Sequence, residues 1–119
     1  MARDHRKLDA FKLSDELAVV IYQITKEFPA SERFGLRSQL RRAAVSVPTN
    51  IVEGCAREPE NEYLRFLDIA VGSAREVLYL VHLAERLEYL ESSDAQLALS
   101  LGDRVAGTLV KLRQSYGRR

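Results

Sequence analysis

The sequence predicts an all-α protein, an antiparallel up-down four-helix bundle formed by one domain over residues 1–119. Apolar residues recur at intervals of three and four along four successive stretches, as on amphipathic helices. Short segments with proline, glycine or serine separate these stretches, and no strand-like alternation is present. Apolar residues make up 46% of the chain, which argues against a disordered protein.

The first helix is expected from about Asp9 to Phe28, because Pro29 disfavours helical geometry in the residue before it. Its apolar face comprises Leu13, Leu17, Val20, Ile21, Ile24 and Phe28. Residues 1–7 and 117–119 are expected to be flexible.

The second helix is expected to begin with Ser31 as N-cap and Glu32 in its first turn, and to run to Gly54. Pro48 lies inside it, so we expect a kink there. The core stripe of this helix consists of Leu36, Leu40, Ala43 and Val47.

The third helix is expected to have Pro59 in its first turn and to reach about Leu90. One apolar stripe consists of Tyr63, Leu67, Ala70, Ala74, Val77, Val81 and Ala84. A second stripe, interrupted by Ser73 and Glu76, consists of Phe66, Ile69, Leu80, Leu83, Leu87 and Leu90. Apolar surface this wide exceeds what one small bundle buries, so it predicts a homo-oligomer.

The fourth helix is expected to be capped by Ser92 or Ser93. Its inward face is predicted to consist of Leu97, Leu101, Val105, Thr108 and Leu112.

The net charge of +1 conceals an uneven distribution: residues 31–57 carry +3, residues 58–101 carry −6 and residues 102–119 carry +4. The chain therefore offers basic patches without being a polycation. Its single cysteine, Cys55, excludes a disulfide-stapled secreted scaffold. The polar N-terminus lacks an apolar signal core and no run is long enough to cross a membrane, so we expect a soluble, cytoplasmic protein.

Basic residues supply the first candidate site. Arg33, Arg37 and Arg41 follow one another at spacings of four, so on one helix they form a basic flank that fits a row of phosphates. The alternative is a solvated face whose arginine stems cover apolar surface. The predicted nucleic-acid-binding set is Arg33, Arg37, Arg41, Arg57, Lys111 and Arg113. We expect no aromatic residue to interleave with these arginines, and therefore little base stacking and low sequence preference.

Polar residues form a second candidate set along another side of the second helix. We predict a structural polar network, satisfied internally or across a subunit contact, that consists of Gln39, Arg42, Ser46, Asn50, Glu53, Ser73 and Glu76. The alternative is a ligand site. If the network buries Arg42, Glu76→Ala should cost about 1–3 kcal/mol.

Catalytic and metal sites are not expected. Cys55 is predicted to be inert, since a reactive thiol needs a base or a positive field beside it. His82 precedes Glu85, but neither histidine of the chain lies in the Glu-x-x-His order of a di-iron bundle. The glycines are isolated, so no phosphate-cradling loop is predicted. We therefore expect no metal, no cofactor and no enzymatic activity.

The chain also resembles a known family. The residues that carry the resemblance are Leu8, Phe11, Ile21-Tyr22, Phe28-Pro29, Glu32, Phe34-Gly35-Leu36, Ser38-Gln39, Arg41-Arg42-Ala43, Ser46, Pro48, Asn50-Ile51, Glu53-Gly54, Arg57, Phe66-Leu67, Ala70, Gly72-Ser73 and Glu76. They resemble the four-helix-bundle family of the 23S rRNA intervening-sequence proteins, to which the accessory variability proteins of diversity-generating retroelements are similar. The sequence departs from the family pattern at Phe11, where tryptophan is frequent, and at Val71, where a basic residue is usual.

The resemblance implies a ring-like homopentamer without known enzymatic activity, and RNA, DNA or reverse-transcriptase partners for some members. Two hypotheses follow. One is an oligomeric accessory protein that binds nucleic acid through repeated arginines. The other is a structural or protein-interaction scaffold whose basic surface docks an acidic protein partner.

Overall fold

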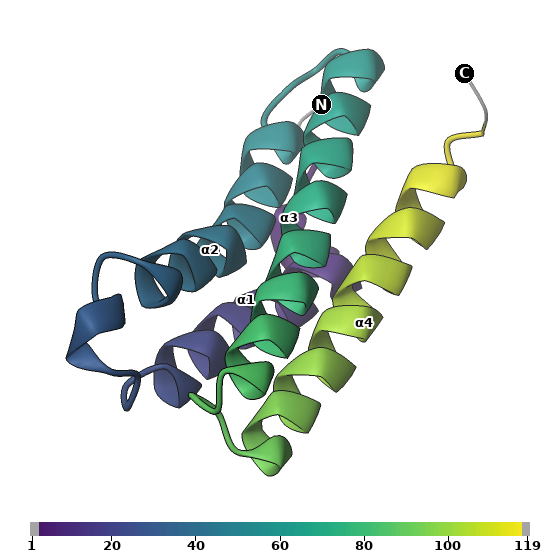
Figure 1. Cartoon of the computed structure of the whole chain (residues 1–119). Coiled ribbons are helices and arrows are strands. Elements are labelled where there is room, and N and C mark those ends of the chain that lie inside the picture. Colours follow the sequence, from purple (N-terminus) through teal and green to yellow (C-terminus); the bar gives the residue numbers. More distant parts are fainter. Residues whose placement is uncertain (1–2, 118–119) are drawn as a thin grey trace.

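The computed structural model describes residues 3–117. Its four helices are α1 (Asp9–Ile24), α2 (Leu36–Cys55), α3 (Glu60–Arg86) and α4 (Ser92–Gln114), with short 3₁₀ helices η1 (His5–Lys7) and η2 (Ala30–Glu32). Each helix packs against the next, and α4 closes the bundle against α1 (Figure 1). The molecule is a rod of 45 × 23 × 23 Å. The predicted all-α, four-helix architecture with antiparallel neighbours is confirmed.

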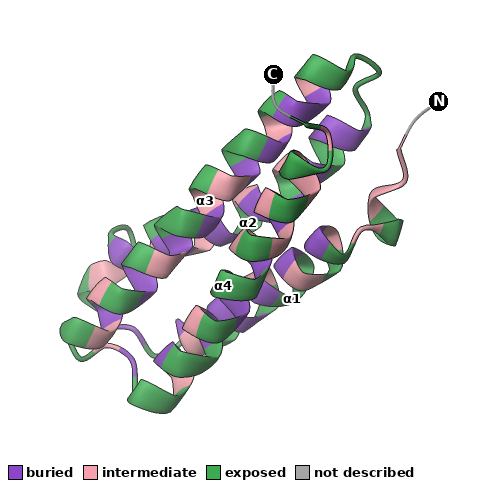
Figure 2. Ribbon diagram, turned by 90° about the vertical axis from the view of Figure 1, so that its right-hand side faces the viewer, coloured by how far each residue is buried: buried purple, intermediate pink, exposed green. Residues whose placement is uncertain are grey.

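The buried faces of all four helices form one core (Figure 2). The predicted core stripe of α2 and the heptad-like stripe of α3 are buried throughout, so the apolar periodicity located both faces correctly. On α4 the prediction is wrong for Leu97, which is exposed. The buried face of α4 consists of Ala95, Ala98, Leu101, Gly102, Val105 and Leu109. Several of these residues are small, and they allow α4 to lie close to α3: a Cβ on Gly102 would stand 2.8 Å from Leu78 Cδ2.

The connection between α1 and α2 differs most from prediction. α1 ends at Ile24 rather than Phe28, and Thr25 is its C-cap. Ser31 is not an N-cap but lies in η2, and α2 begins at Leu36. The backbone N–H of Leu36 donates to Glu32 Oε1 at 2.8 Å, so a glutamate outside the helix satisfies an open donor in its first turn. α2 continues unbroken through Pro48, and a kink there stays a prediction.

The end of α3 is a Schellman motif without glycine. Glu88 has φ 64°, the left-handed conformation usual for glycine at this position. The N–H of Glu88 donates to the Glu85 carbonyl and that of Tyr89 to the Ala84 carbonyl, both at 2.9 Å. This turn ends α3 at Arg86 instead of Leu90 and directs the chain into α4, which starts at Ser92 with Glu91 as N-cap.

The N-terminal segment folds back on the end of α2. Arg3 donates from its backbone N–H to the Cys55 carbonyl at 3.3 Å and from its guanidinium to the Arg57 carbonyl at 2.8 Å. Its guanidinium also lies 4.0 Å from the centre of the Tyr63 ring. Within the predicted flexible arm, Arg3 thus contacts the bundle, whereas residues 1–2 and 118–119 lie outside the described residues, and the flexibility of both ends stays a prediction.

The second apolar stripe of α3 is only partly covered in a single chain. Leu80 and Leu90 are buried, but Ile69 and Leu87 remain exposed. The part left open is consistent with the expectation of a partner copy, which no contact in a single chain tests.

Candidate functional site

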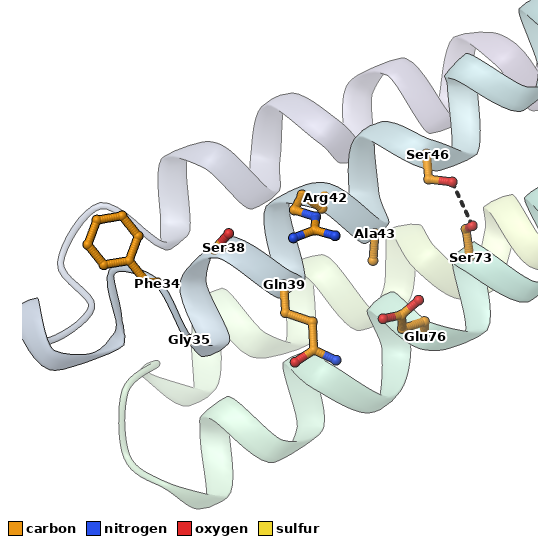
Figure 3. A pocket seen from close by; sticks show the side chains of 9 residues that line it. All are labelled: Phe34, Gly35, Ser38, Gln39, Arg42, Ala43, Ser46, Ser73 and Glu76. Carbon is orange, nitrogen blue, oxygen red and sulfur yellow. Dashed lines mark hydrogen bonds between the residues drawn. The ribbon is translucent and has the colours of Figure 1, made fainter.

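An open groove lies between the first half of α2 and the middle of α3 (Figure 3). We call it the α2–α3 groove. Its volume is about 640 Å³. It is lined by Phe34, Gly35, Ser38, Gln39, Arg42, Ala43, Ser46, Ser73 and Glu76. Five members of the predicted polar network therefore meet here.

Three half-buried side chains of this network bond to one another at one end of the groove. The hydroxyls of Ser46 and Ser73 lie 2.8 Å apart and join α2 to α3. Asn50 Nδ2 donates to the Ser46 carbonyl at 2.8 Å and to Ser46 Oγ at 2.9 Å. These three side chains therefore satisfy one another within the chain, and the wider network stays a prediction.

The other members of the set are exposed. Gln39, Arg42 and Glu76 line the groove, and within residues 3–117 their side chains form no hydrogen bond or ion pair. Glu53 pairs instead with Arg57, at 3.4 Å. Arg42 is exposed, so the condition under which we expect Glu76→Ala to be costly, a buried Arg42, is not met in the single chain. A network completed across a subunit contact stays a prediction.

Phe34 is the most exposed large apolar residue of the described chain, at 88%. It stands at one end of the groove, in the loop between η2 and α2 (Figure 3). Gly35 precedes α2 as its N-cap, with φ −108° and ψ −116°, and the Glu32 carboxylate holds the first turn of α2 behind it. The loop is thus fixed on both sides of an unburied ring.

The expectation that the arginines lack an aromatic neighbour is wrong. The guanidinium of Arg33 lies 5.3 Å from the centre of the Phe34 ring. The sequence contained the signal, since Phe34 adjoins Arg33 and lies between it and Arg37. The sequence alone does not show whether the Phe34 ring is buried in the core or exposed to solvent.

The predicted basic flank of three arginines on one helix is also wrong. Arg33 precedes α2, because the helix starts only at Leu36. Arg41 is half-buried: its Nε donates to Thr25 Oγ1 at 2.8 Å, and its Nη2 donates to the Tyr22 carbonyl at 3.2 Å. Its guanidinium also lies 4.5 Å from the centre of the Tyr22 ring. Arg41 thus fastens α2 to the C-terminal end of α1, where a cation is favourable.

The remaining predicted cations lie far from Arg33 and Arg37. Arg57 follows the opposite end of α2, roughly 30 Å from Arg37 along the helix axis. Arg113 pairs with Asp68 at 3.0 Å. Lys111 is exposed on the last turn of α4. The six predicted nucleic-acid-binding residues therefore do not form one patch.

The described residues offer little support for a reactive cysteine or for a metal site. Cys55 is buried, and burial raises the pKa of its thiol, which disfavours the reactive thiolate. No group of three or more histidine, cysteine, aspartate or glutamate side chains between residues 3 and 117 is arranged to hold a metal ion. Over the same part of the chain, every helix is too short or too polar to span a bilayer.

Comparison with known proteins identifies the family to which the chain belongs. The family model described as "23S rRNA-intervening sequence protein" matches residues 6–111. The chain belongs to this family, as the resemblance indicated.

A solved structure gives the same fold. It is a protein of unknown function from the S23 ribosomal protein family of Bacteroides thetaiotaomicron VPI-5482. The two chains share 23% identity, with a TM-score of 0.82 over 88% of this chain and 98% of that one. No curated protein matches this chain.

Proposed function

We propose that this chain is a non-enzymatic assembly module, whose copies form a homo-oligomer through the α2–α3 groove and Phe34. The observation that carries the proposal is the 88% exposure of Phe34. An aromatic ring held in water gains free energy when a partner surface covers it, and buried aromatic anchors dominate many protein interfaces. Five copies is the number that the family resemblance implies.

The polar lining of the groove supports the same proposal. Arg42 and Glu76 are exposed on facing helices and unpaired within the described residues, so both are available to a second copy. Charged groups at the rim of an interface set its register and orientation more than its affinity. The proposed contact thus combines an aromatic anchor with polar groups that select the partner.

Light scattering and sedimentation on the wild type and Phe34→Ser test the proposal. We expect an oligomer for the wild type, and for Phe34→Ser a dissociation constant at least about tenfold higher. Leu97→Ser is the matched control, because Leu97 is 53% exposed on α4, away from the groove. A monomeric wild type, or equal effects of the two substitutions, would refute the assembly surface.

Weak nucleic-acid binding is the second candidate function, and the contact between Arg33 and Phe34 favours it. An exposed ring beside a guanidinium offers a base-stacking surface with a phosphate-binding cation. The test is an anisotropy titration of Arg33→Glu/Arg37→Glu, because Arg41 is needed for the fold. Phosphate binding weakens log-linearly with salt, whereas apolar docking between copies does not. Equal RNA binding by wild type and variant would exclude this surface.

A further inference from the structure

We propose that a second groove, between α1 and α4, binds an extended chain of phosphate groups. This α1–α4 groove is open, has a volume of about 670 Å³ and shares no lining residue with the α2–α3 groove. Its charged lining consists of Lys12 and Asp9 from α1 with Arg104 and Lys111 from α4. The proposal depends on neither Phe34 nor the assembly of copies.

The cations of this groove are unpaired. Within residues 3–117, the side chains of Lys12, Arg104 and Lys111 form no hydrogen bond or ion pair. In contrast, four arginines elsewhere in the described residues pair with carboxylates, in the contacts Arg6–Asp4, Arg57–Glu53, Arg65–Glu62 and Arg113–Asp68. Three like charges without a partner, lining one groove, create a positive potential that an anionic ligand relieves.

The arrangement favours an extended anion over a single one. Arg104 and Lys111 are seven residues apart on α4, so they lie on the same side and about 10 Å apart along the helix axis. Lys12 contributes a third cation from α1. Asp9 reduces the local excess to two positive charges, and its carboxylate repels anions. A ligand with carboxylate or phosphate groups is therefore disfavoured unless it reaches several of the cations at once. A phosphate chain that runs along the open groove meets that condition.

Gly107 keeps one side of the groove free. A Cβ at this position would meet nothing within 4 Å, so the backbone of α4 is open to a ligand here. Glycine inside a helix is less favourable than alanine, so a close approach to the backbone is a physical reason for its presence. The hydroxyl of Thr108, half-buried beside it, offers a neutral donor. Gly107 also permits a test that leaves the charge unchanged.

Only Lys111 among these cations belongs to the set predicted from sequence. Lys12 and Arg104 stand 92 positions apart, so the packing of α1 on α4 is what brings them together. The available signal was the seven-residue spacing of Arg104 and Lys111 on one helix.

The charge test is an anisotropy titration of the full chain with labelled mixed-sequence single-stranded RNA of about 12 nucleotides. Three phosphate contacts predict a log–log salt slope of about −2, which is roughly 20-fold weaker binding on going from about 50 to about 200 mM salt. Lys12→Gln/Arg104→Gln/Lys111→Gln should abolish most of this slope. Lys26→Gln/Arg75→Gln/Arg86→Gln changes the net charge equally at exposed, unpaired positions of the described chain and should preserve it.

A steric test uses Gly107→Leu, which fills the groove without altering charge. Gly72→Leu is its control, because a Cβ at Gly72 on α3 also meets nothing within 4 Å. We expect Gly107→Leu to weaken RNA binding by at least about tenfold and Gly72→Leu to leave it unchanged. Circular dichroism on each variant confirms that binding is measured on folded protein.

Competition identifies what the groove recognises. Inorganic polyphosphate that displaces the RNA at equal phosphate concentration supports recognition of the phosphate chain itself. Displacement by RNA but not by polyphosphate, or equally by polyglutamate, would overturn that assignment. The proposal also fails if the wild type does not bind RNA at low salt, or if both triple variants bind equally. Loss of binding only in Arg33→Glu/Arg37→Glu would overturn this groove and favour the Arg33–Phe34 surface instead.

Discussion

Two adjacent arginines of α2 have opposite environments. Arg41 points toward α1 and bonds to Thr25 and the Tyr22 carbonyl, whereas Arg42 lines the α2–α3 groove without a side-chain partner in the described chain. A rotation of about 100° between neighbouring helix positions separates a residue that joins the bundle from one that is available to a ligand or partner. The contrast shows that the number of arginines on a helix does not measure its capacity to bind.

The first test of this comparison replaces each arginine by methionine, which keeps much of the apolar stem. Arg41→Met should lower the free energy of unfolding by about 2 kcal/mol, because two hydrogen bonds and the contact with Tyr22 are lost. Arg42→Met should change it by less than about 0.5 kcal/mol. Urea unfolding followed by circular dichroism measures both values, and similar losses would show that the two environments do not differ.

The second test concerns Glu32, which joins three segments. Its Oε1 accepts from the Leu36 N–H at 2.8 Å, and its Oε2 accepts from the Tyr89 hydroxyl at 3.1 Å. Glu32→Ala should therefore cost about 1 kcal/mol, as the loss of a helix-capping side chain does. Glu27→Ala, at an exposed position before η2, is the control and should be nearly neutral. A neutral Glu32→Ala in the same unfolding assay would show that the link contributes nothing.

The architecture was predictable where each residue's role depends on nearby sequence. The buried faces of α2 and α3 follow from apolar spacing alone, because one face must be buried whatever packs against it. The apolar pattern does not predict Gly102 as an inward residue of α4, because only the close approach of Leu78 on α3 favours so small a residue there.

The site was less predictable because it depends on where helices end. The end of α1 at Ile24 places Thr25 within reach of Arg41, and the start of α2 at Leu36 leaves Phe34 in an exposed loop. Glu88 in a glycine-like conformation gave no sequence signal for the turn that brings Tyr89 to Glu32. At each of these points, tertiary contacts set where the helix begins or ends and override the local sequence preference.

Two tyrosines, Tyr63 and Tyr89, should make the stability of the fold depend on alkaline pH. Burial, aided by the neighbouring Tyr116, raises the pKa of Tyr63, and the hydrogen bond to Glu32 raises the pKa of Tyr89. A folded-state pKa above the unfolded value of about 10 means that the stabilisation is complete below about pH 10 and is lost as pH rises through the folded pKa.

The free energy of unfolding should therefore begin to fall near about pH 10 and continue to fall as the pH rises further. Tyr63→Phe should make this fall shallower, Tyr89→Phe should do so to a smaller extent, and the exposed Tyr79→Phe should leave it unchanged. Identical pH profiles for Tyr63→Phe and wild type would contradict the assignment.

The smallest expected effect, in a single chain, is that of Glu76→Ala. Glu76 is exposed in the α2–α3 groove, and its side chain is unpaired within residues 3–117, so its removal should change the free energy of unfolding by less than about 0.5 kcal/mol. This holds at concentrations where the chain is monomeric. If copies cover the groove, the stability of the wild type rises with concentration, because assembly stabilises only the folded form. Glu76→Ala should then reduce that rise without affecting the dilute protein. Melting temperatures of both proteins over a dilution series measure the difference. A loss of stability that is equal at every concentration would show that Glu76 stabilises the single chain, as Arg41 does, and not the contact between copies.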